Sequence, residues 1–256
     1  MIPSVIYLGP IPVHLYGLLI GLGILTAGSL SAHIVKKLNP KHYALSSNHI
    51  WDSLFYAVIG GIIGARLYHV IDLWDYYRHN LVLIPQVWSG GLGIYGAFAG
   101  GVLALYYYAK KHHLKLPVLL DVSVFGIPVA QAIGRIGNFI NQELYGLPTN
   151  LPWGLPIDLS HRLPGYETFT HFHPLFAYEA ILNLISAGII WGFHRKGRWQ
   201  IGQSKYFALY LLNYSIIRTL LEGLRINPWS LFGLPTAQII GIVIIIISGH
   251  FLIKKS

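Results

Sequence analysis

The chain has 256 residues, of which 54% are hydrophobic and only 11% charged, and its mean hydropathy is +0.54. Soluble domains carry charged residues at about a quarter of their positions, so this composition excludes an ordinary soluble domain and indicates a polytopic membrane protein. The chain contains no cysteine, which excludes disulfides, thiolate metal sites and a cysteine nucleophile. Any thiol in the chemistry must therefore belong to a substrate.

Seven charge-poor segments are long enough to cross a bilayer as helices. They lie at residues 13–35, 53–71, 91–109, 116–133, 174–193, 206–222 and 234–253. The sequence predicts an all-α polytopic membrane protein with about seven transmembrane helices, organised as a single integral membrane domain over residues 1–256.

The net charge of +9 does not indicate nucleic-acid binding, because the basic residues gather in alternate connections. Lysines and arginines follow the first, third, fifth and seventh spans, within residues 36–41, 110–115, 195–205 and 254–255. Positive-inside asymmetry predicts a cytoplasmic C-terminus and, with seven spans, an N-terminus outside. No Lys or Arg precedes Lys36, so the basic region of a cleavable signal peptide is missing.

The first residues suit an interface rather than a span. Residues 1–12 are apolar and rich in proline and glycine, which favours an interfacial segment or a short helix on the outer face. His14 and Tyr16 follow at the start of the first span, where such side chains commonly anchor a helix at the membrane surface. Glycine pairs four apart at residues 17–21, 60–64 and 96–100 predict close helix packing.

A polar stretch interrupts the fourth span. Residues 134–146 read Gly-Arg-Ile-Gly-Asn-Phe-Ile-Asn-Gln-Glu-Leu-Tyr-Gly and follow an uncharged segment at 122–133. If the helix continues, Arg135, Asn138 and Gln142 share one face, with Glu143 about 80° away from Arg135. Ionisable groups at membrane depth usually face a cavity or a partner, so this stretch predicts a site; the alternative is a solvated helix end.

Other charged residues lie within spans and need partners there. Tyr214, Arg218 and Glu222 are spaced four apart and form one stripe, which is either a functional cluster or a self-neutralising pair. Glu179 in the fifth span requires a polar partner. Arg66 in the second span either extends to the interface or faces the bundle.

Residues 138–172 form the longest connection, whose prolines and aromatic side chains favour an ordered external cap. Histidines occur in pairs at residues 112–113 and at 171 and 173, without a third ligand at suitable spacing. We expect no metal site in either place.

Residues 134–146 resemble the signature of the prolipoprotein diacylglyceryl transferases. Further similarity lies at residues 14–17, at His173-Pro174 with Tyr178-Glu179, and at Tyr214, Arg218 and Glu222. The resemblance covers almost the whole chain. It implies transfer of the diacylglyceryl group of phosphatidylglycerol to the lipobox cysteine of a prolipoprotein signal peptide, in the bacterial plasma (inner) membrane. It implies no metal or organic cofactor, and a monomer is the default expectation.

The resemblance also implies the site residues. The catalytic candidates are Arg135, Arg218, Tyr95, Glu143, Glu222 and His14. The substrate-binding candidates are Arg135, Asn138, Asn141, Gly146, Tyr16, Tyr214 and Arg66. Forked guanidinium groups suit phosphate oxygens, so Arg135 and Arg218 are expected to hold the phosphate of the leaving group.

The base is left open by the sequence. The family often has histidine at the position of Tyr95, so this chain departs from it there. Tyr95 is expected to position a substrate by hydrogen bonding, with His14 or Glu143 as base; it could act as base itself only if arginines held it as a phenolate. A carrier for an anion or a lipid is the competing interpretation, although no internal repeat supports it.

Overall fold

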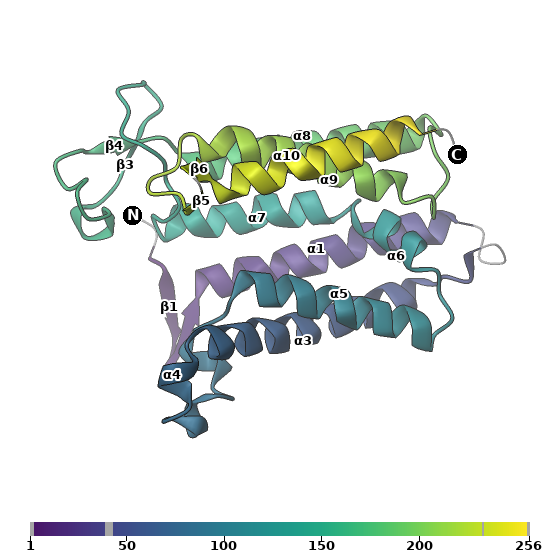
Figure 1. Cartoon of the computed structure of the whole chain (residues 1–256), viewed down its shortest axis with the longest axis horizontal. Coiled ribbons are helices and arrows are strands. Elements are labelled where there is room, and N and C mark those ends of the chain that lie inside the picture. Colours follow the sequence, from purple (N-terminus) through teal and green to yellow (C-terminus); the bar gives the residue numbers. More distant parts are fainter. Residues whose placement is uncertain (1–2, 39–42, 232, 255–256) are drawn as a thin grey trace. The chain divides into compact units, whose positions relative to one another are not determined.

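The computed structural model describes residues 3–38, 43–231 and 233–254, and most of them are helical. The chain divides into two compact units, one formed by residues 1–30 and 121–256 and the other by residues 31–120. Figure 1 labels their helices and strands. Lys41 and Lys255, which contribute to the predicted charge asymmetry, lie outside the described residues.

The smaller unit is built on α3 (Ser47–Asp72) and α5 (Ile94–Lys111), which pack along each other. The hydroxyl of Ser46 accepts the backbone N–H of His49, whose ring accepts the N–H of Ser46, so a capping box begins α3. Between the two helices run α4 (Trp74–Tyr77) and two 3-10 turns, η1 (Leu81–Leu83) and η2 (Val87–Ser89).

Glycines form the contact between α3 and α5. A Cβ on Gly60 would lie 2.7 Å from the carbonyl oxygen of Gly100. One on Gly64 would lie 2.9 Å from the Cα of Gly100 and would overlap the carbonyl oxygen of Gly96. The glycine pairs at residues 60–64 and 96–100 therefore let two backbones touch, which confirms their prediction as packing signals.

The larger unit begins with a hairpin of β1 (Val5–Leu8) and β2 (Ile11–His14), which leads directly into α1 (Leu15–Lys37). The prediction of a short helix here is wrong, while that of an interfacial segment stays a prediction. The β-branched and aromatic residues of β1 favour a strand, and Gly9, with a φ of 63°, supplies the turn. Gly17 and Gly21 meet nothing within 4 Å among the described residues, so the close packing predicted for that pair is not seen within the larger unit and stays a prediction.

The fourth predicted span consists of two helices, α6 (Leu116–Ser123) and α7 (Ile127–Ile140), bent by 48°. At the break, a Cβ on Gly126 would overlap the backbone of Ala27 on α1, so only glycine permits this approach. Pro128 then lies in the first turn of α7, where its missing N–H is tolerated. The break sets the direction in which α7 carries its polar C-terminal end.

Three further helices complete the larger unit: α8 (Leu175–Arg195), α9 (Lys205–Glu222) and α10 (Thr236–Ile253). Helix α8 packs on α7 and α9, and α9 packs on α10. Between α7 and α8 the chain forms η3 (Leu159–His161) and an antiparallel pair of β3 (Leu155–Pro156) with β4 (His171–Phe172). The pair of β5 (Ser230–Leu231) and β6 (Leu234–Pro235) connects α9 to α10.

Asp121 on α6 holds the start of α9. Its fully buried carboxylate accepts the backbone N–H groups of Gly202 and Ser204 at 2.9 Å each, and that of Phe207 at 3.0 Å. N–H groups at a helix start lack intrahelical partners, so this carboxylate supplies the cap that Ser204 does not.

Each of the seven predicted spans coincides with helical structure. Over the described ranges, four helices are long and apolar enough to cross a membrane: α1, α3, α8 and α10. The bent pair of α6 and α7 would be a fifth if it forms one span. Helices α5 and α9 cover their predicted ranges but are less apolar, so the count of seven stays a prediction.

Candidate active site

Helix α7 delivers the polar stretch. Arg135 and Asn138 lie one turn apart near its end, as predicted, but the helix stops at Ile140. Gln142 has a φ of 51°, so it is off the helical face on which the sequence placed it. Its amide instead donates to the Asp158 carboxylate at 2.9 Å, and its carbonyl accepts the N–H of Asp158 at 2.7 Å. Gln142 therefore ties the cap to the end of α7.

Arg135 reaches from α7 to α8. Its Nη2 lies 2.5 Å from Oε1 of Glu179, and its Nη1 donates to Oδ1 of Asn138 at 2.8 Å. The side chain of Glu179 is only 9% exposed, while that of Arg135 is 23% exposed. The predicted need of Glu179 for a polar partner is thus met by Arg135.

Asn138 continues the network to the segment after α7. Its amide nitrogen donates to Oε1 of Glu143 at 2.8 Å, and the amide of Asn141 donates to the same oxygen at 3.4 Å. Asn138 is almost fully buried. Both the oxygen and the nitrogen of its side-chain amide form hydrogen bonds, so Asn138 fixes the positions of Arg135 and Glu143 relative to each other.

A second group of charges lies at the end of α9. Arg218 Nη2 is 2.7 Å from Oε2 of Glu222, and Arg225 Nη1 is 3.7 Å from the same oxygen. Glu222 is 3% exposed, whereas the arginines are 26% and 35% exposed. One buried carboxylate thus orients two partly accessible guanidinium groups.

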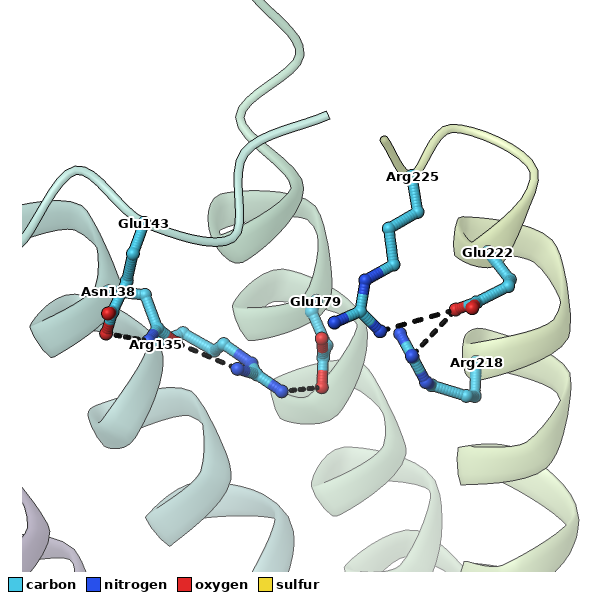
Figure 2. A network of polar contacts seen from close by, with 7 residues as sticks. All are labelled: Arg135, Asn138, Glu143, Glu179, Arg218, Glu222 and Arg225. Atoms are coloured by element: carbon cyan, nitrogen blue, oxygen red, sulfur yellow. Dashed lines mark hydrogen bonds and ion pairs between the residues drawn. The ribbon is translucent and has the colours of Figure 1, made fainter. Parts of the chain in front are cut away.

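Figure 2 shows Glu179 between these two groups, with Arg135 on one side and Arg225 and Arg218 on the other. The charged residues of this cluster are Arg135, Arg218 and Arg225 with Glu143, Glu179 and Glu222, so its formal net charge is zero. Tyr214, one turn before Arg218 on α9, is close enough to Glu179 and to all three arginines to interact with them electrostatically. The predicted stripe on α9 therefore faces the charges of α7 and α8.

Two glycines bring neighbouring segments to this cluster. A Cβ on Gly137 would overlap the ring of Tyr16, so the first turn of α1 lies directly against α7 beside Asn138. A Cβ on Gly146 would lie 2.7 Å from the carbonyl oxygen of Leu224 and 3.0 Å from Cβ of His173. Gly146 therefore joins the cap to the end of α9 and the start of α8, which is a packing role.

The cap is an ordered structure on the larger unit. Its apolar cluster consists of five buried residues: Tyr145, Ile157, Phe172, Phe176 and Ile226. The Tyr145 hydroxyl donates to the carbonyl of His161 at 2.9 Å and accepts the N–H of Leu163 at 2.7 Å. Burial raises the pKa of the Tyr145 phenol above its ordinary value, which keeps it protonated and able to donate. The predicted ordered cap between α7 and α8 is confirmed as a folded segment.

Aromatic residues link the cap to the first turn of α8. The indole N–H of Trp153 donates to the hydroxyl of Tyr178 at 2.7 Å, and this hydroxyl lies 3.2 Å from Nδ1 of His173. Tyr178 precedes Glu179, so the cap contacts α8 next to the carboxylate that binds Arg135.

Three predicted site residues remain, one in the larger unit and two in the smaller unit. His14 is exposed at the end of β2. Tyr95 belongs to the smaller unit, where it is 54% exposed and its ring centroid lies 6.0 Å from that of Tyr68. Arg66 is buried in the smaller unit.

Arg66 is buried rather than extended to solvent, and none of the ion pairs within residues 3–38, 43–231 and 233–254 involves it. Its guanidinium donates to the carbonyls of Leu83 and Ile84 at 2.5 and 2.7 Å, and of Gly90 and Gly91 at 2.7 and 3.2 Å. These bonds hold the connection between α3 and α5 in place.

Glu179 and Arg225 belong to the cluster but were not among the predicted site residues. Glu179 could have been found because it is an ionisable residue in an apolar span. Arg225 could have been found because it lies three residues after Glu222. No group of three potential metal ligands occurs within residues 3–38, 43–231 and 233–254.

Apolar helices of membrane length, together with a charged cluster carried by α7, α8 and α9, define a helical membrane protein that has a polar site among its helices. Residues 3–254 match the profile of the prolipoprotein diacylglyceryl transferase family. The chain belongs to this family.

Its relatives include enzymes named phosphatidylglycerol–prolipoprotein diacylglyceryl transferase from several bacteria. The one from Cutibacterium acnes is 40% identical over 230 residues, which cover 87% of this chain and 74% of the relative. The one from Trichormus variabilis is 38% identical over 243 residues, covering 94% and 84%. The one from Synechococcus elongatus is 36% identical over 246 residues, covering 95% and 83%.

Proposed function

We propose that this chain transfers the diacylglyceryl group of phosphatidylglycerol to the cysteine thiol of a prolipoprotein lipobox, and that Arg135 and Arg218 bind the phosphate. Membership of the transferase family supports the reaction. The observation that carries the residue assignment is the orientation of the two arginines. Each is held by a glutamate that is at most 9% exposed, yet each stays about a quarter exposed, at 23% and 26%.

The chemistry needs cations at the leaving group. The thiolate sulfur attacks the glyceryl carbon that carries the phosphate oxygen, a C–S bond forms, and the C–O bond breaks. The products are the thioether and glycerol phosphate, which is the leaving group. The phosphate of glycerol phosphate carries one more negative charge than the phosphodiester did. The thiol proton goes to a base. Guanidinium groups aimed at these oxygens stabilise the growing charge, so they act most strongly in the transition state.

The neutral balance of the cluster suits this task. The glutamates offset the charges of the arginines, which lowers the free-energy cost of keeping charged groups in an apolar bundle. A guanidinium has five N–H donors, and the bonds of Arg135 to Asn138 and Glu179 use two of them. Donors therefore remain for phosphate oxygens.

Glu143 is the base candidate that the contacts favour. It is linked through Asn138 to Arg135, whereas exposed His14 has no such link among the described contacts. In this proposal Glu143 accepts the thiol proton, and the amides of Asn138 and Asn141 hold its carboxylate in place.

The proposed placement follows the charge pattern. The chain crosses the bacterial plasma (inner) membrane seven times, with the N-terminus and the cap outside and the C-terminus in the cytoplasm. The site then opens to the outer side, where the signal peptide and phosphatidylglycerol meet. The enzyme acts as a monomer without a metal or organic cofactor.

A reconstitution assay tests the reaction. The full chain in proteoliposomes containing phosphatidylglycerol is given a lipobox peptide, and mass spectrometry follows diacylglyceryl addition together with release of glycerol phosphate. A peptide with serine in place of the lipobox cysteine is the matched control and should stay unmodified. Flux of phosphatidylglycerol or of an anion without any peptide modification would favour a carrier and overturn the proposal.

A further inference from the structure

A groove lies between α9 and α10, away from the arginine cluster. It has a volume of about 280 Å³. Its apolar lining includes Phe207 and Leu211 on α9 and Ile244, Ile247 and Phe251 on α10. The lining on α9 ends seven residues before Arg218, which is about 10 Å of helix. The groove is therefore distinct from the proposed substrate site.

The groove offers almost no polar contact. Ser248 is part of its lining, but the hydroxyl donates to the carbonyl of Ile244 at 2.5 Å. This hydroxyl is satisfied within α10, and the remaining lining favours a hydrocarbon chain.

A buried cation lies at one end of this groove. Lys205 is the first residue of α9, next to the lining residue Ser204, and its ammonium donates to the carbonyl of Lys254 at 3.1 Å. None of the ion pairs within the described ranges involves Lys205. An anion bound beside this ammonium would therefore be favourable.

Exposed basic side chains surround this end of the larger unit. Arg195, Lys196 and Arg198 are exposed where α8 turns toward α9, and Lys254 is exposed after α10. Asp121 is the acid that lies there, but its carboxylate is occupied by backbone N–H groups of the start of α9. Such a basic surface attracts anionic lipid headgroups.

We propose that this groove binds one acyl chain of an anionic phospholipid whose phosphate lies at Lys205. The lipid serves as a bound partner and is not the molecule that is cleaved. Charge complementarity selects this occupant: the groove accepts a hydrocarbon chain, while the cationic end accepts the headgroup that continues from it.

Native mass spectrometry of the full chain in detergent tests the proposal. Dioleoylphosphatidylserine is compared with dioleoylphosphatidylcholine at equal concentration, because these lipids share their acyl chains and differ in net charge. We expect one phosphatidylserine molecule to stay bound with a preference of about fivefold over phosphatidylcholine for each lysine contact.

Paired variants locate the bound lipid. Lys205→Gln should remove most of the preference, and Leu211→Trp, which fills the groove, should remove the adduct. The controls are Lys37→Gln at the exposed end of α1 and Ile246→Trp, which lies on α10 at 65% exposure and outside the groove lining; both should bind as the unaltered chain does. Thermal melting of each purified variant checks that it is folded. An unchanged adduct in folded Leu211→Trp, or equal loss in Leu211→Trp and Ile246→Trp, would overturn the proposal.

Discussion

Arg135 on α7 and Glu179 on α8 are joined by an ion pair of 2.5 Å between Nη2 and Oε1 (Figure 2). The same guanidinium binds Asn138, so its plane is fixed by two partners from different helices. Removing either member of a buried pair leaves an uncompensated charge, which costs about 3–5 kcal/mol. Glu179 is thus a positioning residue for Arg135 as well as a link between α7 and α8.

The fork of Arg135 should be essential. Arg135→Lys keeps the charge, but one ammonium cannot bind Asn138, Glu179 and two phosphate oxygens in one plane. We expect transfer to fall on the order of 100-fold in the reconstitution assay. Arg198→Lys, in the exposed connection before α9, is the matched control and should stay fully active. Turnover close to that of the unaltered chain in Arg135→Lys would contradict the proposed clamp.

Exchanging Arg218 and Glu222 tests whether this ion pair has a structural or a functional role. Exchanging the two residues keeps both charges on α9, so insertion should change little. Transfer should be lost, because the carboxylate that faces Arg225 is removed and the guanidinium moves one helical turn. Membrane fractionation and the transfer assay measure these outcomes. An exchanged chain with full activity would show that the pair only neutralises itself.

Gly137 should be sensitive to a single methyl group. Gly137→Ala forces Cβ into the ring of Tyr16, and we expect a loss of about 1–3 kcal/mol in stability. Gly134→Ala is the matched control on the same helix, because a Cβ there meets nothing within 4 Å. Thermal melting in detergent compares them, and Tyr16→Ala should restore the stability of Gly137→Ala. Equal stability of the two glycine variants would contradict this contact.

The helices were predictable because their signal is local. Runs of apolar residues of bilayer length leave the backbone few alternatives to helix, and each predicted span overlaps helical structure, although α3 begins six residues early and α7 ends seven residues late. The break at Gly126 was not predictable, since it depends on the approach of Ala27 from a distant segment. The β1–β2 hairpin was missed because its proline and glycine content favoured an interfacial segment or a short helix over a pair of strands.

The charged residues of the site were recognisable, but their partners were not. Spacing placed Arg218 and Glu222 together, since residues four apart meet on one helix. The pair of Arg135 with Glu179 joins residues 44 apart in the sequence, and only the packing of α7 on α8 creates it. The prediction that Gln142 shares a helical face with Arg135 was wrong because α7 ends at Ile140, two residues before Gln142.

The orientation in the membrane has a direct test. The chain has no cysteine, so single cysteines can be introduced at Thr149 in the cap and at His113 between α5 and α6. An impermeant maleimide applied to intact cells with a permeable outer layer should label Thr149→Cys and leave His113→Cys unlabelled. Lysed cells provide the control, in which both should react. Labelling of His113→Cys alone in intact cells would invert the proposed orientation.

The last prediction concerns Tyr95, where this chain departs from the histidine common in the family. We expect its hydroxyl to position a substrate, since a phenolate at membrane depth would require both desolvation and charge to be overcome. Tyr95→Phe removes only that hydroxyl and should reduce transfer by about tenfold, in keeping with the loss of a hydrogen bond to a charged group. Raising the pH should recover little of the loss, because the thiol proton is assigned to Glu143.

Glu143→Gln should therefore lose more activity than Tyr95→Phe, and a peptide thiol that ionises more readily should rescue Glu143→Gln rather than Tyr95→Phe. Tyr68→Phe is the control for a neighbouring phenol, as its ring lies 6.0 Å from that of Tyr95. If Tyr95→Phe abolishes turnover while phosphatidylglycerol still binds, and the acidic thiol restores it, Tyr95 is the base and Glu143 has another role.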